Sequence, residues 1–140
     1  MFWDFFKFGV KEEGPSKGRI SIGKSGEDEA AKVLEKKGYK ILDRNYRTRY
    51  GEVDIVARDG QTIVFVEVKK RRSNRYGSAK EAIGQKKMKR LAMAAKDYIL
   101  KHSEGHAKGL NSRFDVVSIE THRDLNGRVE HVKNAFEAGD

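Results

Sequence analysis

The chain has 140 residues, enough for one domain with a buried core, and 37% of them are hydrophobic. It holds 30 Lys and Arg against 21 Asp and Glu, and the resulting formal net charge of +9 favours a polyanionic partner. The absence of cysteine excludes a disulfide scaffold, a thiol nucleophile and a zinc site built on thiolates. It also fits a reducing compartment, and no apolar run is long enough to span a membrane, so we expect a cytoplasmic protein.

Residues 1–20 are predicted to form an aromatic arm and linker, followed by a single domain over residues 21–140. The first eight residues are rich in Phe and Trp, but Asp4 and Lys7 interrupt the run, which argues against a secretory signal peptide. Two interpretations of the arm remain. It either packs on its own domain or frays, or it forms a short amphipathic helix that rests on a membrane or a partner.

The first predicted elements are a helix and two strands. Apolar residues at three- and four-residue spacing predict a helix that begins near Gly23 and stops at Gly38. A short apolar piece at 40–42 and a basic segment with interleaved tyrosines at 44–50 follow. Two strand patterns then cover 52–58 and 62–69, and they are joined through Asp59-Gly60, a pair that favours a β-hairpin.

The second half repeats this alternation of helix and strand. Residues 71–77 are predicted to be a loop, and the amphipathic pattern over 78–101 predicts a long helix. A strand over 114–119 is expected to pair with 129–132 through a second hairpin turn at Asn126-Gly127. The order of elements indicates an α/β fold in which a central mixed β-sheet is flanked by α-helices.

The strand over 62–69 has two unlike faces, because successive side chains of a strand point to opposite sides. Its even positions from 64 to 68 are valine, whereas its odd positions end in Glu67 and Lys69. In the preceding strand, one face is expected to carry Glu52, Asp54 and Val56, and the other Val53, Ile55 and Ala57. If the strands pair, Asp54 approaches Glu67, and two carboxylates without sulfur or imidazole suit Mg²⁺. The alternative is a salt bridge between Glu67 and Lys69 on a solvated face.

Asp54 followed by Glu67-Val68-Lys69 resembles the Asp…(Asp/Glu)-x-Lys signature of the restriction-endonuclease-like nuclease superfamily. The wider pattern resembles the YraN family, small bacterial proteins with expected endonuclease-like folds that are related to archaeal Holliday-junction resolvases. The matching residues are Gly26-Glu27, Ala30, Leu34, Gly38-Tyr39, Arg44-Asn45, Gly51-Glu52-Val53-Asp54, Phe65-Val66-Glu67-Val68-Lys69, Arg71, Lys87, Arg113-Phe114-Asp115 and Asn134-Ala135-Phe136. The resemblance implies a restriction-endonuclease-like core.

The resemblance also implies roles for individual residues. Asp54 and Glu67 would be metal carboxylates, with the main-chain carbonyl of Val68 as a further ligand. Lys69 would orient the attacking water and stabilise developing negative charge. Glu27 matches the position that adds an acidic ligand or a water-mediated contact in related nucleases. The implied cofactor is Mg²⁺, with Mn²⁺ as a substitute, and the implied activity is hydrolysis of phosphodiester bonds in branched or structured DNA.

Basic residues are concentrated beside this expected site. Between Lys69 and Arg90 there are ten Lys and Arg against one acid, a net +9 that equals the excess of the whole chain. Such a patch favours contacts to phosphates, so we expect a nucleic-acid partner, namely DNA. The candidate contacts are Arg44, Arg47, Arg49, Arg71, Arg72, Arg75 and Lys87.

Alternatives to the nuclease hypothesis stay open on the sequence. The basic residues also suit a solvated helix face and a positive loop. A noncatalytic nucleic-acid-binding module that keeps the nuclease fold would carry the same residues. A third hypothesis is an adaptor tethered through the aromatic arm. If the protein cuts both strands of a duplex, a symmetric homodimer is expected.

Overall fold

The computed structural model describes residues 22–71, 84–120 and 128–136, which contain a five-stranded mixed sheet and two helices. The elements are α2 (Ile22–Lys36), β1 (Lys40–Thr48), β2 (Gly51–Asp59), β3 (Thr62–Arg71), α3 (Gln85–His102), β4 (Asn111–Glu120) and β5 (Arg128–Phe136). The strands lie in the order β1-β2-β3-β4-β5. Only β3 and β4 are parallel, and the other neighbours are antiparallel. The α/β fold with a mixed sheet, predicted from the sequence, is confirmed.

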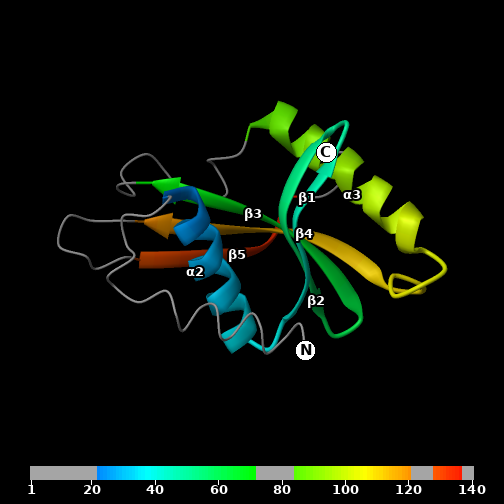
Figure 1. Ribbon diagram of the computed structural model, residues 1–140, viewed down its shortest axis with the longest axis horizontal. Coiled ribbons are helices and arrows are strands. Elements are labelled where there is room, and N and C mark those ends of the chain that lie inside the picture. The colour runs from blue at the N-terminus through cyan, green and yellow to red at the C-terminus, as the bar shows by residue number, and fades with distance from the viewer. Residues whose placement is uncertain (1–21, 72–83, 121–127, 137–140) are drawn as a thin grey trace.

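The two helices pack on opposite faces of the sheet, which therefore has two apolar cores (Figure 1). On one face, α2 buries Ala30 and Leu34 against the even-numbered valines of β3. On the other face, α3 buries Leu91 and Tyr98 against Phe65 of β3. Both helices thus follow the predicted amphipathic patterns. Neither one has the length and apolar character that crossing a membrane requires.

Glycines end α2 and close the first hairpin. Gly38 follows the helix with φ at 93°, a conformation that glycine adopts without the steric cost that other residues meet. Asp59 pairs with Thr62, so Gly60 and Gln61 are the central turn residues, one position later than the predicted Asp59-Gly60 pair. Gly60 has φ at 62°, and positive φ at the first central residue alone is typical of a type II′ turn. The second predicted turn, at 126–127, lies outside the described residues.

Several strands are longer than predicted. The apolar piece and the basic segment form the single nine-residue strand β1, which pairs with β2 alone in the part of the chain that is described. Edge strands tolerate polar and charged side chains, so the hydrophobic pattern underestimated the length of β1. The predicted helix over 78–101 is observed from Gln85, while 78–83 lie outside the described residues.

The predicted faces of β2 are wrong near its start. Val53 packs in the core on the α3 face, whereas Ile55 packs on the α2 face, although strict alternation would put both side chains on one side. The neighbouring strand β1 also changes face here, where Tyr46 pairs with Val53. Asn45 has φ at 53° and precedes Tyr46, whose side chain packs on the α3 face. Asp54 therefore lies where β2 switches from one core to the other.

A buried polar network connects β4 to β2 and β5. The Asp115 carboxylate is fully buried and accepts hydrogen bonds from Arg113 Nε at 2.9 Å and from the Asn134 main-chain N–H at 3.0 Å, with His131 Nε2 at 2.8 Å. Burial raises the pKa of Asp115, but these hydrogen bonds outweigh burial and lower it. Arg113 also lies 3.1 Å from Asp59 of β2. These residues brace the sheet away from the expected site.

Candidate active site

The hairpin of β2 and β3 opens where the predicted acidic residues lie. Main-chain pairing runs from the turn to Ile55 and Val66 and ends there. Beyond this point the Asp54 side chain replaces the main-chain acceptor, because the Val68 N–H donates to its Oδ2 atom at 2.8 Å. Asp54 is thereby fixed between the strands, and the main chain around Val68 is released from ladder pairing with β2.

Glu67 is the most deeply buried acidic group beside this opening. Its side chain is 4% exposed, and its Oε2 atom lies 3.2 Å from Nζ of Lys87 on α3. Its Oε1 atom is also buried and has no hydrogen-bond partner among the described residues. Burial and the Asp54 charge raise the pKa of Glu67 to about 7, although Lys87 and Lys69 act in the opposite direction. The structure thus brings Asp54 and Glu67 together, and a solvated Glu67–Lys69 salt bridge is wrong.

The pKa of Asp54 is raised as well. Burial is the main cause, and the nearby Glu52 charge adds to it, whereas the Val68 N–H and Lys87 lower the pKa. Both neighbouring carboxylates thus resist ionisation, and a cation bound between them would stabilise their charged forms. Lys69 is half-buried on β3, where it pairs with Ser118 of β4.

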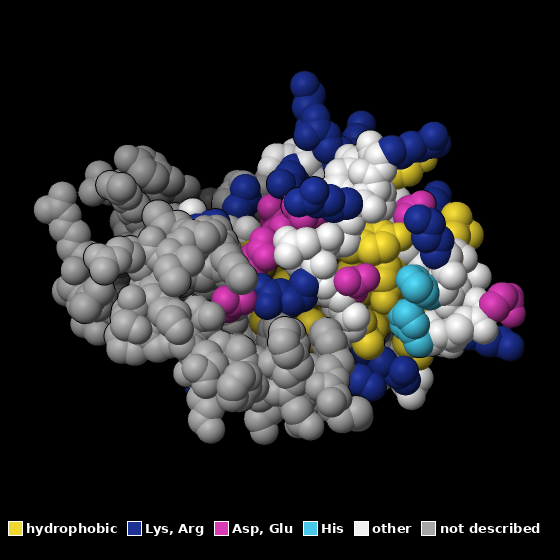
Figure 2. All heavy atoms as spheres, viewed as in Figure 1, with side chains coloured by type: hydrophobic (Ala, Val, Ile, Leu, Met, Phe, Trp, Pro, Cys, Tyr) yellow, Lys and Arg dark blue, Asp and Glu magenta, His cyan; other side chains and the backbone are white. Residues whose placement is uncertain are grey.

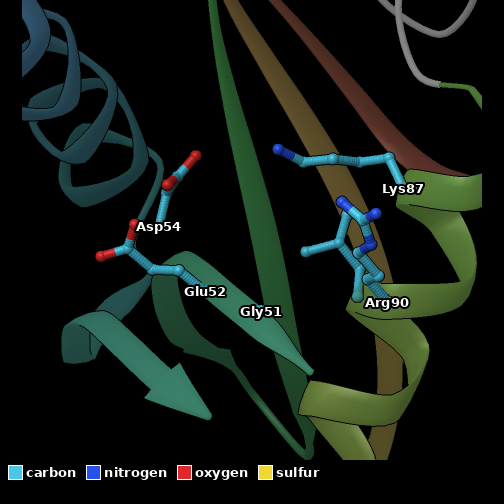
Figure 3. A pocket seen from close by; sticks show the side chains of 6 residues that line it. Gly51, Glu52, Asp54, Lys87 and Arg90 are labelled. Atoms are coloured by element: carbon cyan, nitrogen blue, oxygen red, sulfur yellow. The ribbon is translucent and has the colours of Figure 1, made fainter. Parts of the chain in front are cut away.

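A cavity of about 200 Å³ opens beside Asp54. It is lined by Gly51, Glu52, Asp54, Lys87, Arg90 and Leu91. Figure 3 shows Asp54 and Glu52 on one side of β3 and Lys87 and Arg90, both from α3, on the other. Arg90 was not among the predicted contacts; it lies three residues after Lys87 and so on the same side of the helix. An acidic wall that faces a basic wall suits a phosphate bound through a cation.

Glu27 of α2 lies at the edge of the acidic group. Burial and the Asp54 charge raise its pKa, and Arg44 opposes them. The Asn45 side-chain amide, oriented to satisfy its neighbours, donates to Glu27 Oε1 at 3.1 Å and to Glu52 Oε2 at 3.2 Å. Asn45 therefore joins α2 to β2 across the acidic cluster. Asn45 is one of the residues that match the family pattern, but the resemblance implied no role for it.

The residues present fit a hard divalent cation. No group of three His, Asp or Glu side chains converges within the described ranges, but Mg²⁺ is commonly held by one or two carboxylates together with water and substrate oxygens. Asp54 and Glu67 supply two carboxylates, and the unpartnered Glu67 Oε1 is an oxygen without a protein donor. With the Val68 carbonyl, the donor set would be all oxygen, which suits Mg²⁺ or Mn²⁺ rather than a thiophilic metal.

Comparison with known proteins places this arrangement in a family. The family model described as "Uncharacterised protein family UPF0102" matches residues 26–119, which include Glu27, Asp54, Glu67 and Lys87. The chain belongs to UPF0102. This is the YraN family, so the resemblance noted on the sequence is confirmed.

Relatives of the UPF0102 chain match along most of its length. A UPF0102 protein of Persephonella marina is 44% identical over 115 residues, which cover 82% of this chain and 92% of that protein. One from Syntrophus aciditrophicus is 47% identical, covering 84% of this chain and 90% of its own. One from Anaeromyxobacter dehalogenans is 46% identical, covering 89% and 90% respectively. None of these names states an activity.

Arg44, predicted to bind nucleic acid, joins β1 to α2 in this UPF0102 protein. Its Nη2 atom lies 2.8 Å from Asp28 Oδ1 and 3.7 Å from Glu27 Oε1, and its side chain is 23% exposed. The guanidinium therefore neutralises the start of the acidic cluster. Its contact with nucleic acid stays a prediction.

The β1–β2 turn presents two further predicted residues. Arg47 is 82% exposed, and its Nε atom lies 3.3 Å from Glu52 Oε2, so Glu52 pairs with an arginine of the neighbouring strand. Arg49 donates to the Tyr50 hydroxyl at 2.9 Å, and its guanidinium lies 5.0 Å from that ring centre. Both arginines are exposed, and their contact with nucleic acid stays a prediction.

The remaining predicted basic residues are only partly described. The main chain of Arg71 ends β3, while Arg72 and Arg75 lie outside the described residues. Lys87 projects from the first turn of α3 to Glu67. Figure 2 shows Lys and Arg side chains gathered over the region of α3 and β1, next to a group of Asp and Glu side chains. The basic and acidic groups predicted from the sequence are therefore neighbours on this face.

Proposed function

We propose that this UPF0102 protein is a divalent-metal-dependent nuclease that hydrolyses phosphodiester bonds in DNA. The observation that carries the proposal is the carboxylate pair of Asp54 and Glu67, in which the buried Glu67 Oε1 has no hydrogen-bond partner among the described residues. Burying two adjacent carboxylates is costly unless a cation joins them. Lys69 follows Glu67 on the same strand, as a nuclease of this kind requires.

Each residue of the cluster has a task in this reaction. Asp54, Glu67 and the Val68 carbonyl would hold the metal, which when bound activates a water and neutralises phosphate oxygens. Lys69 donates a hydrogen bond to the attacking water and stabilises the charge that develops on phosphorus-bound oxygens. The water oxygen bonds to phosphorus and gives up a proton to solvent, while the bond to the leaving oxygen breaks and that oxygen takes up a proton from solvent.

The charge distribution supports DNA as the substrate. Lys87 and Arg90 line the cavity, exposed Arg47 contacts its lining residue Glu52, and exposed Arg49 lies in the adjoining β1–β2 turn. Such contacts go to phosphates and carry no base information, so we expect DNA shape, including branched or flapped forms, to determine preference. If both strands are cut, two copies of the chain would act together.

A nuclease assay tests the proposal. Single-stranded, duplex, flapped and four-way-junction DNA are incubated with the protein in Mg²⁺, Mn²⁺ or EDTA. We expect wild-type cleavage of at least one substrate, which EDTA and Glu67→Gln both abolish. Glu29→Gln is the matched control, because it removes one exposed carboxylate from α2 and should leave cleavage unchanged.

Two outcomes would contradict the proposal. Cleavage that persists in Glu67→Gln shows that the carboxylate pair is not the catalytic site. Tight binding of one DNA structure without cleavage in either metal supports a noncatalytic nucleic-acid-binding module instead.

A further inference from the structure

Lys87 is the only residue that the described part of the chain places in an ion pair with Glu67. Its Nζ atom lies 3.2 Å from Glu67 Oε2, yet its own side chain is 45% exposed while Glu67 is 4% exposed. The ammonium thus enters from solvent and reaches a buried oxygen. Figure 3 shows the amino group of Lys87 directed across β3 toward the side on which Asp54 lies.

This single ammonium leaves the carboxylate pair incompletely neutralised. Lys87 lowers the pKa of both Glu67 and Asp54, but burial still raises both values, and the Asp54 charge adds to it for Glu67 and the Glu52 charge for Asp54. A divalent cation would neutralise the pair more fully. It would also repel the ammonium strongly, because two cations on neighbouring oxygens of a partly buried site interact at low effective dielectric constant.

We infer that Lys87 is a resident counter-ion that a divalent metal displaces from Glu67, and that the released ammonium then contacts the phosphate of the bound nucleic acid. This inference rests on the proposed function. Metal binding would then couple to nucleic-acid binding through one side chain. The four-carbon stem of lysine permits this exchange, because its ammonium is a flexible point charge rather than a rigid fork.

The position of Lys87 in the cavity is compatible with a contact to Glu67 and with a contact to a bound phosphate. The same cavity is lined by Arg90, one helical turn later, which stays on the basic wall. An ammonium that leaves Glu67 therefore remains within the cavity and joins a second cation. Two cations on one wall are suited to a phosphodiester that approaches the metal from the open side.

Calorimetric titration of the full chain with Mg²⁺, at pH 8.5 and without nucleic acid, tests the exchange. Lys87→Met removes the competing cation, so we expect Mg²⁺ to bind about tenfold more tightly than to the wild type. Lys87→Arg keeps the charge and should bind within about threefold of the wild type. Lys89→Met removes a neighbouring exposed lysine from the same helix and should leave Mg²⁺ affinity unchanged.

The outcomes separate this inference from the proposed function. If the wild type binds Mg²⁺ in a manner that Glu67→Gln abolishes, but Lys87→Met binds no more tightly, the counter-ion role is overturned and the metal site stands. If the wild type shows no such binding, the metal site fails and the inference fails with it. Circular dichroism of each variant establishes that the fold is retained.

A second measurement addresses the released ammonium. A labelled oligonucleotide duplex is titrated by fluorescence anisotropy with and without Mg²⁺, on a time scale shorter than that of its cleavage. The increase in DNA affinity that Mg²⁺ produces should be several-fold larger in the wild type than in Lys87→Met, because only the wild type has a lysine that the metal frees to contact phosphate. Equal increases in both proteins would overturn the transfer of Lys87 to phosphate.

Discussion

Replacing Glu67 with Gln should make the metal-free protein more stable at alkaline pH, because the wild-type side chain then carries a buried charge. Glutamine has nearly the same shape and is neutral. Its amide also provides a donor on one of the two terminal atoms, whereas the Oε1 atom of Glu67 has no partner in the described structure. Lys87 loses its acceptor, but its side chain is 45% exposed and the ammonium can be hydrated instead.

The size of the effect follows from the raised pKa. The folded protein holds the Glu67 proton with a pKa of about 7, against an ordinary value of 4.5. Because the folded state binds this proton more tightly than the unfolded state, stability falls as pH rises from about 4.5 to about 7. The full contribution is about 3 kcal/mol, since one pKa unit corresponds to about 1.4 kcal/mol. Between pH 5 and pH 8, the free energy of unfolding of the variant should therefore rise by about 2 kcal/mol relative to that of the wild type, which corresponds to roughly 6 °C in Tm.

Urea unfolding in EDTA at several pH values between 5 and 8 measures this gap, with Glu29→Gln as the control. Parallel stability curves for wild type and Glu67→Gln would refute the reasoning, because Glu67 would then not be strained by its charge. Saturating Mg²⁺ should reverse the order of stability. The wild type gains binding free energy from the metal and the variant does not.

Three further changes test other parts of the structure. Asp115→Asn should lower the free energy of unfolding by about 3–5 kcal/mol, because it breaks the buried ion pair with Arg113, which keeps only Asp59 as a charged partner; urea unfolding measures it, and a loss below about 1 kcal/mol would contradict the network. Tyr46→Phe removes a 2.7 Å hydrogen bond to Asp97 and should cost about 1–2 kcal/mol in the same experiment, whereas no loss would show that the bond contributes nothing. Arg90→Gln should reduce the slope of log K against log salt for DNA binding by about 1, and an unchanged slope would exclude a phosphate contact.

The sequence predicted the acidic pair because local rules determine its position. A two-residue turn after Asp59 fixes the register of β2 against β3. The odd face of β3 then carries Glu67 toward the level of Asp54, and alternation along a regular strand is reliable. Deep burial of Glu67 was not predictable in the same way, because it depends on how α3 covers the sheet.

The face change in β2 was missed because alternation assumes a regular strand. One residue at positive φ, Asn45, is enough to shift the side chains that follow it in β1 to the other face, and β2 changes face at Asp54 alongside it. The pairing of Lys87 with Glu67 was missed for a different reason. The two residues come from elements that meet only in three dimensions, and a lysine on an amphipathic helix is ordinarily solvated.

The parallel pairing of β3 with β4 has a kinetic consequence. β1, β2 and β3 form a meander of local hairpins, whereas Val64 of β3 pairs with Arg113 of β4 across the whole of α3. Closing that longer loop costs more chain entropy, so the meander is expected to form first during folding. Asp54 and Glu67 would then be in place before β4 and β5 dock. A defect at Asp115 should accordingly accelerate unfolding and leave the refolding rate nearly unchanged.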